Sequence, residues 1–429
     1  MRALGPWALA ASIVNVTVGG GIFRLPASVA GALGAAAPLA YLVCAAAMAL
    51  IVLCFAEAGS RVALTGGPYA YVEVAFGPFV GFLSGVLLWL VGTFALAAVA
   101  TLLADALGGL VPALPAGAGG RAALLGLVLA ALAAVNAAGV RQGARLNTVA
   151  TVAKLLPLGV VIVAGAFLVR AEHLAVTAAP APGTLARSAV VLVFAFAGVE
   201  SALVPSGEVR EPARTVPRAL VIAMTGVTLL YLALQFVAQG VLGPALATSP
   251  TPLAAVAERA LGAPGRGLLL AGAAVSMFGY VSGMTLAVPR ALFAFARDGF
   301  LPRALAAVHS QHRTPHRAIW AQTALVWLLA ASGTFERLAV LANVSTLLLY
   351  AACCVAAGAL RRRDVRAPGA GAVRVPFHPV VPWLALLVIA LLLTGVTGAE
   401  WAVVLGVLAA AALGYALLGR RRRAVATPA

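Results

Sequence analysis

Three consecutive glycines inside an apolar stretch are the first residues that could bind a ligand through the backbone. They are Gly19, Gly20 and Gly21, within Val18–Ile22. Each glycine costs about 1 kcal/mol relative to alanine inside a helix, so three in a row predict an interruption. The N–H groups and the dipole at the start of the segment from Ile22 onward would then favour an anion such as a carboxylate. The alternative interpretation is close packing of two helices through small residues.

A second stretch, residues 194–200, could supply the opposite charge preference. A helical segment that ends near Phe196–Gly198 would expose carbonyl oxygens at the negative end of its dipole, and an ammonium group fits there. A carboxylate and an ammonium group on one carbon define an α-amino acid. The residues predicted to bind it are Val18, Gly19, Gly20, Gly21 and Ile22 in the first stretch and Phe194, Ala195, Phe196, Ala197 and Gly198 in the second.

The residues around the second interruption are small or apolar, and the only acidic neighbour is Glu200. This composition favours a neutral and rather apolar amino acid over a cationic one. An apolar pocket discriminates by only about 1–3 kcal/mol per methylene group, so we expect overlapping substrates.

Lys154 and Glu200 are ionisable residues inside apolar stretches, and they are the predicted coupling and gating residues. An ammonium group in a bilayer normally faces a cavity or a partner. Lys154 therefore either docks against carbonyl groups of the first interrupted helix, where release of its proton would couple transport to protons, or extends to the membrane surface. Glu200 either gates the site and accepts a proton or is a structural carboxylate bonded to nearby backbone. For Arg24 we expect a plain ion pair or an extended surface position, and the alternatives are a place in the lining of the external vestibule or a pair to Glu200.

The composition requires a membrane around these residues. Of 429 residues, 63% are hydrophobic and 10% are charged, and the mean hydropathy is +1.06. Soluble domains carry roughly 25% charged residues, and disordered chains are poor in apolar residues, so both classes are excluded. A helix needs about 20 apolar residues to cross a bilayer. We expect twelve transmembrane helices, near residues 7–31, 36–60, 79–107, 121–139, 146–169, 186–206, 217–242, 266–296, 318–333, 336–360, 379–398 and 400–419.

The net charge of +17 does not indicate a nucleic-acid partner, because the basic residues lie in short clusters between apolar runs. With the N-terminus in the cytoplasm, 21 of the 29 Lys and Arg residues fall on the cytoplasmic side and 6 on the other side. This asymmetry and the even number of helices predict two cytoplasmic termini and a position in the cell (inner or plasma) membrane.

The two predicted interruptions lie at matching places. Each falls in the first helix of a group of five, and the groups cover residues 7–170 and 186–360. An odd number of helices gives two such groups opposite orientations, which is typical of transporters built from inverted repeats. The predicted fold is an all-α membrane protein with one transmembrane domain, residues 1–429, in which two further helices, 379–419, follow a five-plus-five repeat.

Other chemistries find little support in the sequence. It has no GxxxxGK[ST] phosphate-binding loop, and no Ser/His/Asp or metal-ligand set indicates an enzyme. Thr314-Pro315 interrupts the histidines His309, His312 and His316, so we expect a solvated loop there rather than a metal site. The four cysteines lie in apolar segments and are interpreted as small core residues. We expect no catalytic residue, no cofactor and no bound metal.

Several motifs in a fixed order extend over nearly the whole chain. They are Gly19-Gly20-Gly21-Ile22-Phe23 with Leu25-Pro26, Ala56-Glu57, Thr65-Gly66-Gly67-Pro68-Tyr69-Ala70-Tyr71, Phe76-Gly77-Pro78, Phe196-Ala197-Gly198-Val199-Glu200-Ser201, Glu211-Pro212, Thr215-Val216-Pro217-Arg218-Ala219, and Arg290 with Ala296-Arg297-Asp298-Gly299-Phe300-Leu301-Pro302. This pattern resembles the amino acid–polyamine–organocation (APC) superfamily of amino acid permeases.

The resemblance implies a LeuT-like fold and alternating access, with the substrate carboxylate held by Gly19–Gly21 and its amine held near Ala195–Gly198. It also implies that Lys154 stands where some proton-dependent members carry a lysine in place of a sodium ion. The run from Phe194 resembles the arginine/agmatine antiporter branch, in which the glutamate contributes to gating. Phe194 replaces a tryptophan of that branch and Gly20 replaces a serine, and both differences argue against a cationic substrate.

The sequence therefore predicts a secondary amino acid transporter that is proton-coupled or exchanging. The nearest alternative is an antiporter for cationic amino acids or polyamines, and a second alternative is a non-transporting amino-acid sensor. The expected partners are an amino acid, protons and the lipid bilayer, and the chain is expected to be a monomer or a homodimer.

Overall fold

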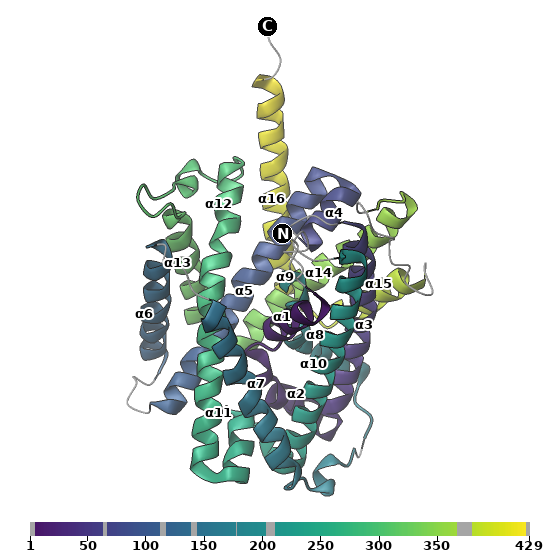
Figure 1. Ribbon diagram of the computed structural model, residues 1–429, viewed down its shortest axis with the longest axis vertical. Helices are drawn as coiled ribbons and strands as arrows, with labels where there is room; N and C mark the ends of the chain where they lie inside the picture. Colours follow the sequence, from purple (N-terminus) through teal and green to yellow (C-terminus); the bar gives the residue numbers. More distant parts are fainter. Residues whose placement is uncertain are drawn as a thin grey trace.

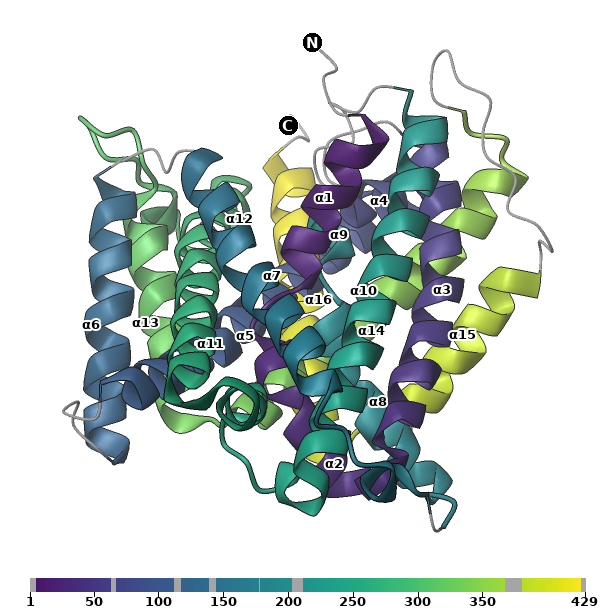
Figure 2. The ribbon, with the colours of Figure 1, turned by 60° about the horizontal axis from the view of Figure 1, so that its bottom comes forward.

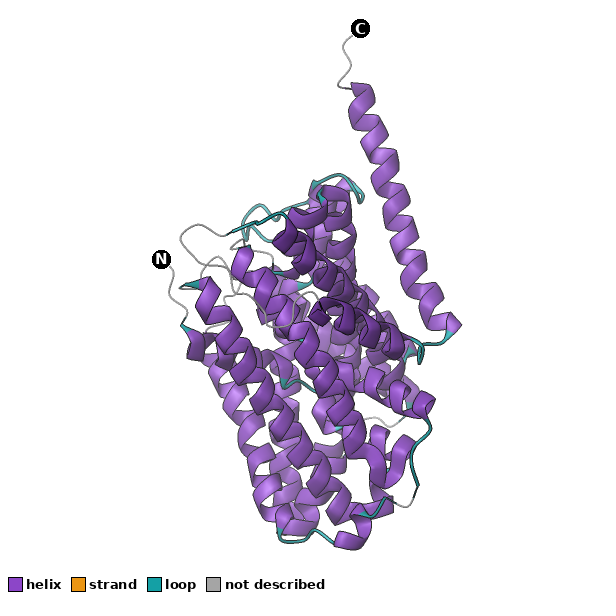
Figure 3. Ribbon diagram, turned by 90° about the vertical axis from the view of Figure 1, so that its right-hand side faces the viewer, coloured by secondary structure: helices purple, strands orange, loops and turns teal. Residues whose placement is uncertain are grey.

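The computed structural model describes residues 5–62, 67–111, 117–138, 144–176, 178–202, 211–366 and 380–425, and these residues form helices and loops without a strand (Figure 3). The α-helices are α1 (Pro6–Thr17), α2 (Leu25–Leu33), α3 (Ala37–Arg61), α4 (Pro68–Phe76), α5 (Pro78–Leu110), α6 (Ala118–Ala137), α7 (Ala144–Ala166), α8 (Pro182–Phe196), α9 (Val199–Ala202), α10 (Pro212–Leu242), α11 (Pro252–Ala287), α12 (Pro289–Arg297), α13 (His316–Ser332), α14 (Phe335–Arg362), α15 (Val380–Leu393) and α16 (Gly398–Val425).

Each stretch expected to span the membrane coincides with one or two of these helices. Within the part of the chain that the structure describes, seven helical stretches are long and apolar enough to cross a bilayer: Leu25–Arg61, Pro78–Leu110, Ala118–Ala137, Arg214–Leu246, Pro252–Arg297, Phe335–Arg362 and Gly398–Leu417. Of the five other expected spans, two are interrupted, α13 and α15 have only 17 and 14 residues, and α7 contributes the shorter apolar stretch Lys154–Ala166. Residues 139, 203–206 and 379 of the expected spans, and Thr65 and Gly66 of the motifs, lie outside the described residues.

Proline begins most of the helices and explains why they start where they do. A proline occupies the first or second position of α1, α3, α5, α8, α10 and α11, where its missing N–H is not needed for a helical hydrogen bond. The short helix α4 and the separation of α12 from α11 are additions that hydropathy alone did not indicate, and both also begin at prolines.

The long helix α5 lies in the centre of the molecule and packs against α11 and α14. Figure 2 shows α6, α11, α12 and α13 on one side of the molecule and α3, α10 and α15 on the other. Helix α1 begins and α16 ends toward the same end of the molecule (Figure 2). Figure 1 shows α1 and α2 in the middle of the bundle, next to α8 and α10, so the first interruption lies deep inside the fold.

We predict opposite effects of one substitution at two glycines of α7. A Cβ atom at Gly165 would lie 2.5 Å from Cγ1 of Val237, whereas a Cβ at Gly159 would have no atom within 4 Å. Gly165→Ala should lower the free energy of unfolding by about 1–3 kcal/mol, because a β-branched neighbour cannot turn aside. Gly159→Ala should leave it unchanged or raise it slightly. Thermal unfolding in detergent checks this, and equal midpoints for the two variants would contradict the close packing of α7 against α10.

Candidate functional site

The helical backbone is interrupted between α1 and α2. Helix α1 ends at Thr17, Val18 leaves the helical region with ψ 77°, and the Gly19 N–H donates to the Thr17 carbonyl (2.8 Å). A single 3-10 turn covers Gly21–Phe23. The α-helix resumes at Leu25 rather than at Ile22, the expected position, because Pro26 is accommodated only in the first turn of a helix.

A second interruption separates α8 from α9. Helix α8 ends at Phe196, Ala197 is extended (φ −69°, ψ 159°), and Gly198 has a φ of +120°. A Cβ atom on Gly198 would lie 3.2 Å from the backbone carbon and oxygen of Val16 on α1. Glycine is required here both for the positive φ and for the close approach of the two interrupted helices.

The hydroxyl of Tyr231 lies between the two interruptions. This fully buried residue of α10 places its oxygen 3.0 Å from the Thr17 carbonyl and 2.9 Å from the Ala195 carbonyl. The ring of Phe196 packs edge-on against it, with the ring centres 5.3 Å apart. One phenol therefore donates toward carbonyl groups at the ends of both α1 and α8.

A cavity of about 380 Å³ opens where the two interruptions meet. Gly19, Gly20, Phe194, Ala197 and Gly198, five of the ten residues predicted to bind a ligand, line it. The remaining five do not line it: Val18, Gly21, Ile22, Ala195 and Phe196 are buried in the packing behind it. The other walls come from α5, α11 and α14.

Polar groups are few in this cavity. The hydroxyl oxygen of Thr17 is buried, and no hydrogen-bond partner lies within reach among the described residues. On α5, the Trp89 indole donates to Gln322 of α13 (3.0 Å), which orients the indole along the cavity wall. Among the described residues of the lining, Glu200 alone has a carboxylate or a basic side chain.

Lys154 is buried on α7 and donates to the Asn15 carbonyl of α1. In an unbroken helix that carbonyl would accept a hydrogen bond from the Gly19 N–H. Here the Gly19 N–H donates to the Thr17 carbonyl instead. The interruption therefore creates the acceptor that the ammonium group uses. The expected docking against the first interrupted helix is present, and the alternative of an extension to the surface is wrong, because the side chain is 5% exposed.

Glu200 is also buried, and its Oε2 accepts two hydrogen bonds. One comes from the Gly198 N–H (2.9 Å) and the other from the Tyr350 hydroxyl of α14 (2.6 Å). The bond to nearby backbone expected of a structural carboxylate is present, together with a bond to a second helix. The alternative pair between Arg24 and Glu200 is wrong: Arg24 forms an ion pair with Glu336 (3.3 Å) and donates to the carbonyls of Ser249 and Pro250.

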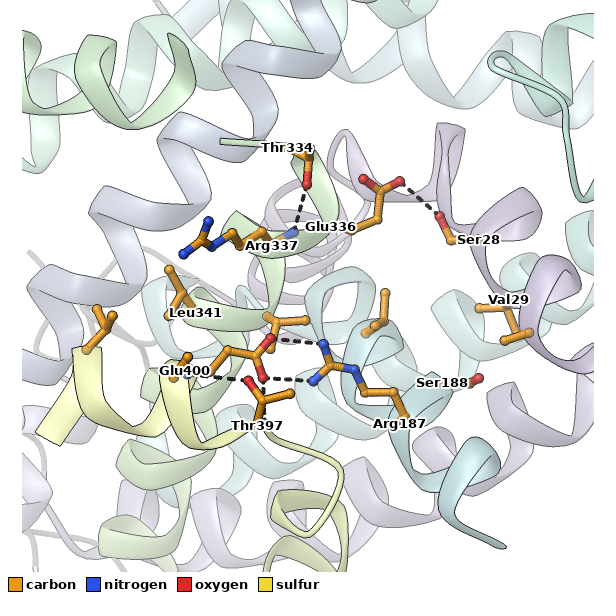
Figure 4. A pocket seen from close by; sticks show the side chains of 15 residues that line it. Ser28, Val29, Arg187, Ser188, Thr334, Glu336, Arg337, Leu341, Thr397 and Glu400 are labelled. Atoms are coloured by element: carbon orange, nitrogen blue, oxygen red, sulfur yellow. Dashed lines mark hydrogen bonds and ion pairs between the residues drawn. The ribbon is translucent and has the colours of Figure 1, made fainter. Parts of the chain in front are cut away.

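A second cavity, of about 520 Å³, lies on the side predicted to face outward (Figure 4). Arg187 and Glu400 face each other across it through two hydrogen bonds of 2.9 Å. Glu400 also accepts from the Thr397 N–H (2.8 Å), which caps the start of α16. Phe194, which lines the first cavity, meets the ring of Phe335 edge-on with the ring centres 5.4 Å apart, and the chain neighbours of Phe335, Thr334 and Glu336, line the second cavity.

The histidine loop has no geometry for a metal ion. The rings of His309 and His312 lie 4.7 Å apart, and one ring nitrogen of His309 faces backbone N–H groups of the same loop. Across the described residues, no group of three His, Cys, Asp or Glu side chains could hold a metal. The four cysteines are buried and free.

A family model described as amino acid permease matches residues 4–412. The chain belongs to the amino acid permease family. This is a family of multi-pass membrane transporters rather than of enzymes, and the apolar helices of the permease agree with that class.

Three curated relatives of the permease come from Bacillus subtilis (strain 168). It is 27% identical to a methylthioribose transporter over 98% of its own length and 94% of the relative's. It is 27% identical to the branched-chain amino acid permease BcaP, covering 90% and 86% of the two chains. It is 28% identical to the serine/threonine exchanger SteT, covering 87% and 86%.

Sequence reasoning missed three residues that complete the site: Tyr231, Tyr350 and Asn343. Each is a polar residue inside a long apolar helix, and each is fully buried. A polar side chain at such a position normally faces another helix or a cavity, and this signal was available in the sequence. The partner of each residue was not, because it lies on a helix distant in the chain.

We predict that Tyr231→Phe destabilises the permease by about 1–3 kcal/mol, because it removes the hydroxyl donor from the Ala195 carbonyl and leaves the Thr17 carbonyl with only the Gly19 N–H. Tyr280→Phe is the matched control. Its hydroxyl lines the cavity, and no hydrogen bond links it to the described residues. The measurement is the thermal unfolding midpoint in detergent, and a Tyr231→Phe midpoint equal to that of the control would show that the bridge contributes nothing.

Proposed function

We propose that this permease carries a neutral α-amino acid across the cell membrane by alternating access. The observation that supports this most directly is the 380 Å³ cavity at the meeting point of two interrupted helices. The interruptions lie in the first elements of the segments 7–170 and 186–360, which agrees with a five-plus-five inverted repeat and twelve membrane crossings.

The two interruptions offer opposite charges to one zwitterion. The N–H group of Gly20, which precedes the 3-10 turn, and the Thr17 hydroxyl both belong to residues of the lining, and they suit a carboxylate. The Gly198 N–H donates to Glu200, so the Phe194 carbonyl lacks the bond that a continuous helix would provide. Such a carbonyl end suits an ammonium group.

The lining supports a substrate without a net side-chain charge. Of the lining residues that the structure describes, only Glu200 carries a carboxylate, and it already accepts from Gly198 and Tyr350. A cationic side chain would therefore find no open carboxylate. The relatives named for branched-chain amino acids and for serine and threonine agree with a neutral substrate.

Two contacts near the cavities support a state closed toward the outside. The ring of Phe194, in the lining of the first cavity, packs against Phe335, and the Arg24–Glu336 pair joins the start of α2 to the start of α14. Opening toward the outside would require these contacts to separate while the cytoplasmic ends close. We further infer that Lys154 exchanges a proton during this cycle and that both termini are cytoplasmic.

Uptake into proteoliposomes tests the function. A panel of the twenty amino acids and of polyamines should identify a neutral amino acid that is accumulated. Uptake that needs a cationic counter-substrate inside would indicate a cationic amino acid or polyamine antiporter instead, and binding without flux would indicate a sensor.

We predict that Gly19→Ala keeps the fold but weakens amino acid binding at least 10-fold. A Cβ at this position would meet protein atoms only at 3.9 Å, so the added methyl group enters the cavity rather than the protein interior. Binding measured by thermal shift and by competition in detergent checks this. Unchanged affinity in a normally folded variant would show that no ligand approaches Gly19.

We predict that a pH gradient drives uptake without sodium and that Lys154→Ala abolishes this accumulation while some binding remains. Lys154→Arg is the companion variant: it retains the charge opposite the Asn15 carbonyl but cannot release its proton, so exchange should persist without accumulation. Sodium dependence of the unmodified protein, or full accumulation by Lys154→Ala, would rule out this coupling role.

A further inference from the structure

In the part of the chain that the structure describes, the side-chain carboxamide of Asn343 forms hydrogen bonds through its nitrogen but not through its oxygen. The side chain lies on α14, is fully buried and lines the 380 Å³ cavity. Its Nδ2 donates to the Val190 carbonyl of α8 (2.7 Å) and approaches that of Val191 (3.4 Å). Its Oδ1 is buried and has no hydrogen-bond partner among the described residues. Buried polar atoms of this kind are uncommon and call for an explanation.

The orientation of this carboxamide follows from its neighbours. A carbonyl oxygen such as that of Val190 can only accept, so the atom 2.7 Å from it must be the NH₂ group. The oxygen therefore occupies the other branch of the amide, and it offers an acceptor alone. A ligand that satisfies it must carry an O–H or N–H donor.

The position of Asn343 along α8 separates it from the groups that suit a zwitterion. Its contacts at Val190 and Val191 precede Phe194, whose carbonyl suits the ammonium group, by three to four residues, about 5–6 Å along the helix. The ammonium and carboxylate of an amino acid lie on one carbon, so both fit at the interruptions. The free oxygen of Asn343 then faces the part of the substrate that extends beyond that carbon.

We propose that Asn343 Oδ1 accepts a hydrogen bond from the side chain of the substrate, which makes the substrate a neutral amino acid with a hydroxyl or carboxamide donor. This inference rests on the proposed function and narrows it from neutral amino acids in general. It differs from the apolar preference that the residues around the second interruption suggest, because the acceptor comes from α14. The same carboxamide contacts α8, so a bound side chain also steadies the outer half of that interrupted helix.

Binding to matched substrate pairs tests the proposal. The pairs are threonine with valine, asparagine with leucine, and glutamine with methionine, each with one member that carries a donor and one of similar shape without it. The unmodified permease should prefer the polar member of at least one pair by roughly 3- to 10-fold. Asn343→Leu should bring that ratio to about 1. A ratio that stays the same in the variant, or no polar preference in any pair, overturns the proposal and leaves the oxygen to a bound water.

A control variant and a substitute variant separate the possible failures. Ser345→Ala, the control, removes a buried hydroxyl of α14 that donates to the Leu341 carbonyl (3.0 Å). Ser345 does not line the cavity, so the binding ratios should not change. If Asn343→Leu does not fold, Asn343→Ser removes the carboxamide with a shorter polar side chain and should lose the same preference. If the unmodified protein binds no amino acid at all, the proposed function itself fails. Binding of apolar amino acids with unaltered ratios refutes only the role of Asn343.

Discussion

A backbone group that loses its helical hydrogen bond inside a bilayer has no water to replace it, and this constraint governs the centre of the permease. Both interruptions expose such groups, and particular side chains from other helices satisfy them. Lys154 donates to the Asn15 carbonyl, Tyr231 donates toward the Thr17 and Ala195 carbonyls, and Glu200 accepts from the Gly198 N–H.

The side chains that satisfy the interruptions also connect elements that alternating access would move. Lys154 comes from α7, Tyr231 from α10, and Tyr350, the second partner of Glu200, from α14. A displacement of α1 or α8 changes several hydrogen bonds at once, so the bundle should favour a few discrete arrangements over a continuous range. The aromatic pair of Phe194 and Phe335 and the ion pair of Arg24 with Glu336 belong to one of these arrangements.

Membership of the family accounts for the helical membrane architecture, but it does not identify the substrate. Relatives with 27–28% identity over most of their length are named for a methylthioribose, for branched-chain amino acids and for serine and threonine. In the proposed binding mode, the interrupted helices would recognise charged groups through the backbone, which is independent of side-chain identity. Selectivity would then reside in side chains such as Trp89 and Asn343, which line the same cavity from α5 and α14.

The sequence by itself determined the helical class, the helix positions and the two places where the helix breaks, because hydropathy, proline and glycine act over a few residues. It also singled out Lys154 and Glu200, since an ionisable residue in an apolar run is conspicuous in any sequence. Only the tertiary structure decided the partners. Lys154 and Asn15 are 139 positions apart, Tyr231 and Thr17 are 214 apart, and Arg24 and Glu336 are 312 apart. No local pattern relates such residues, because their proximity depends on how whole helices pack, and that packing also separates the predicted ligand-binding residues that line the cavity from those buried behind it.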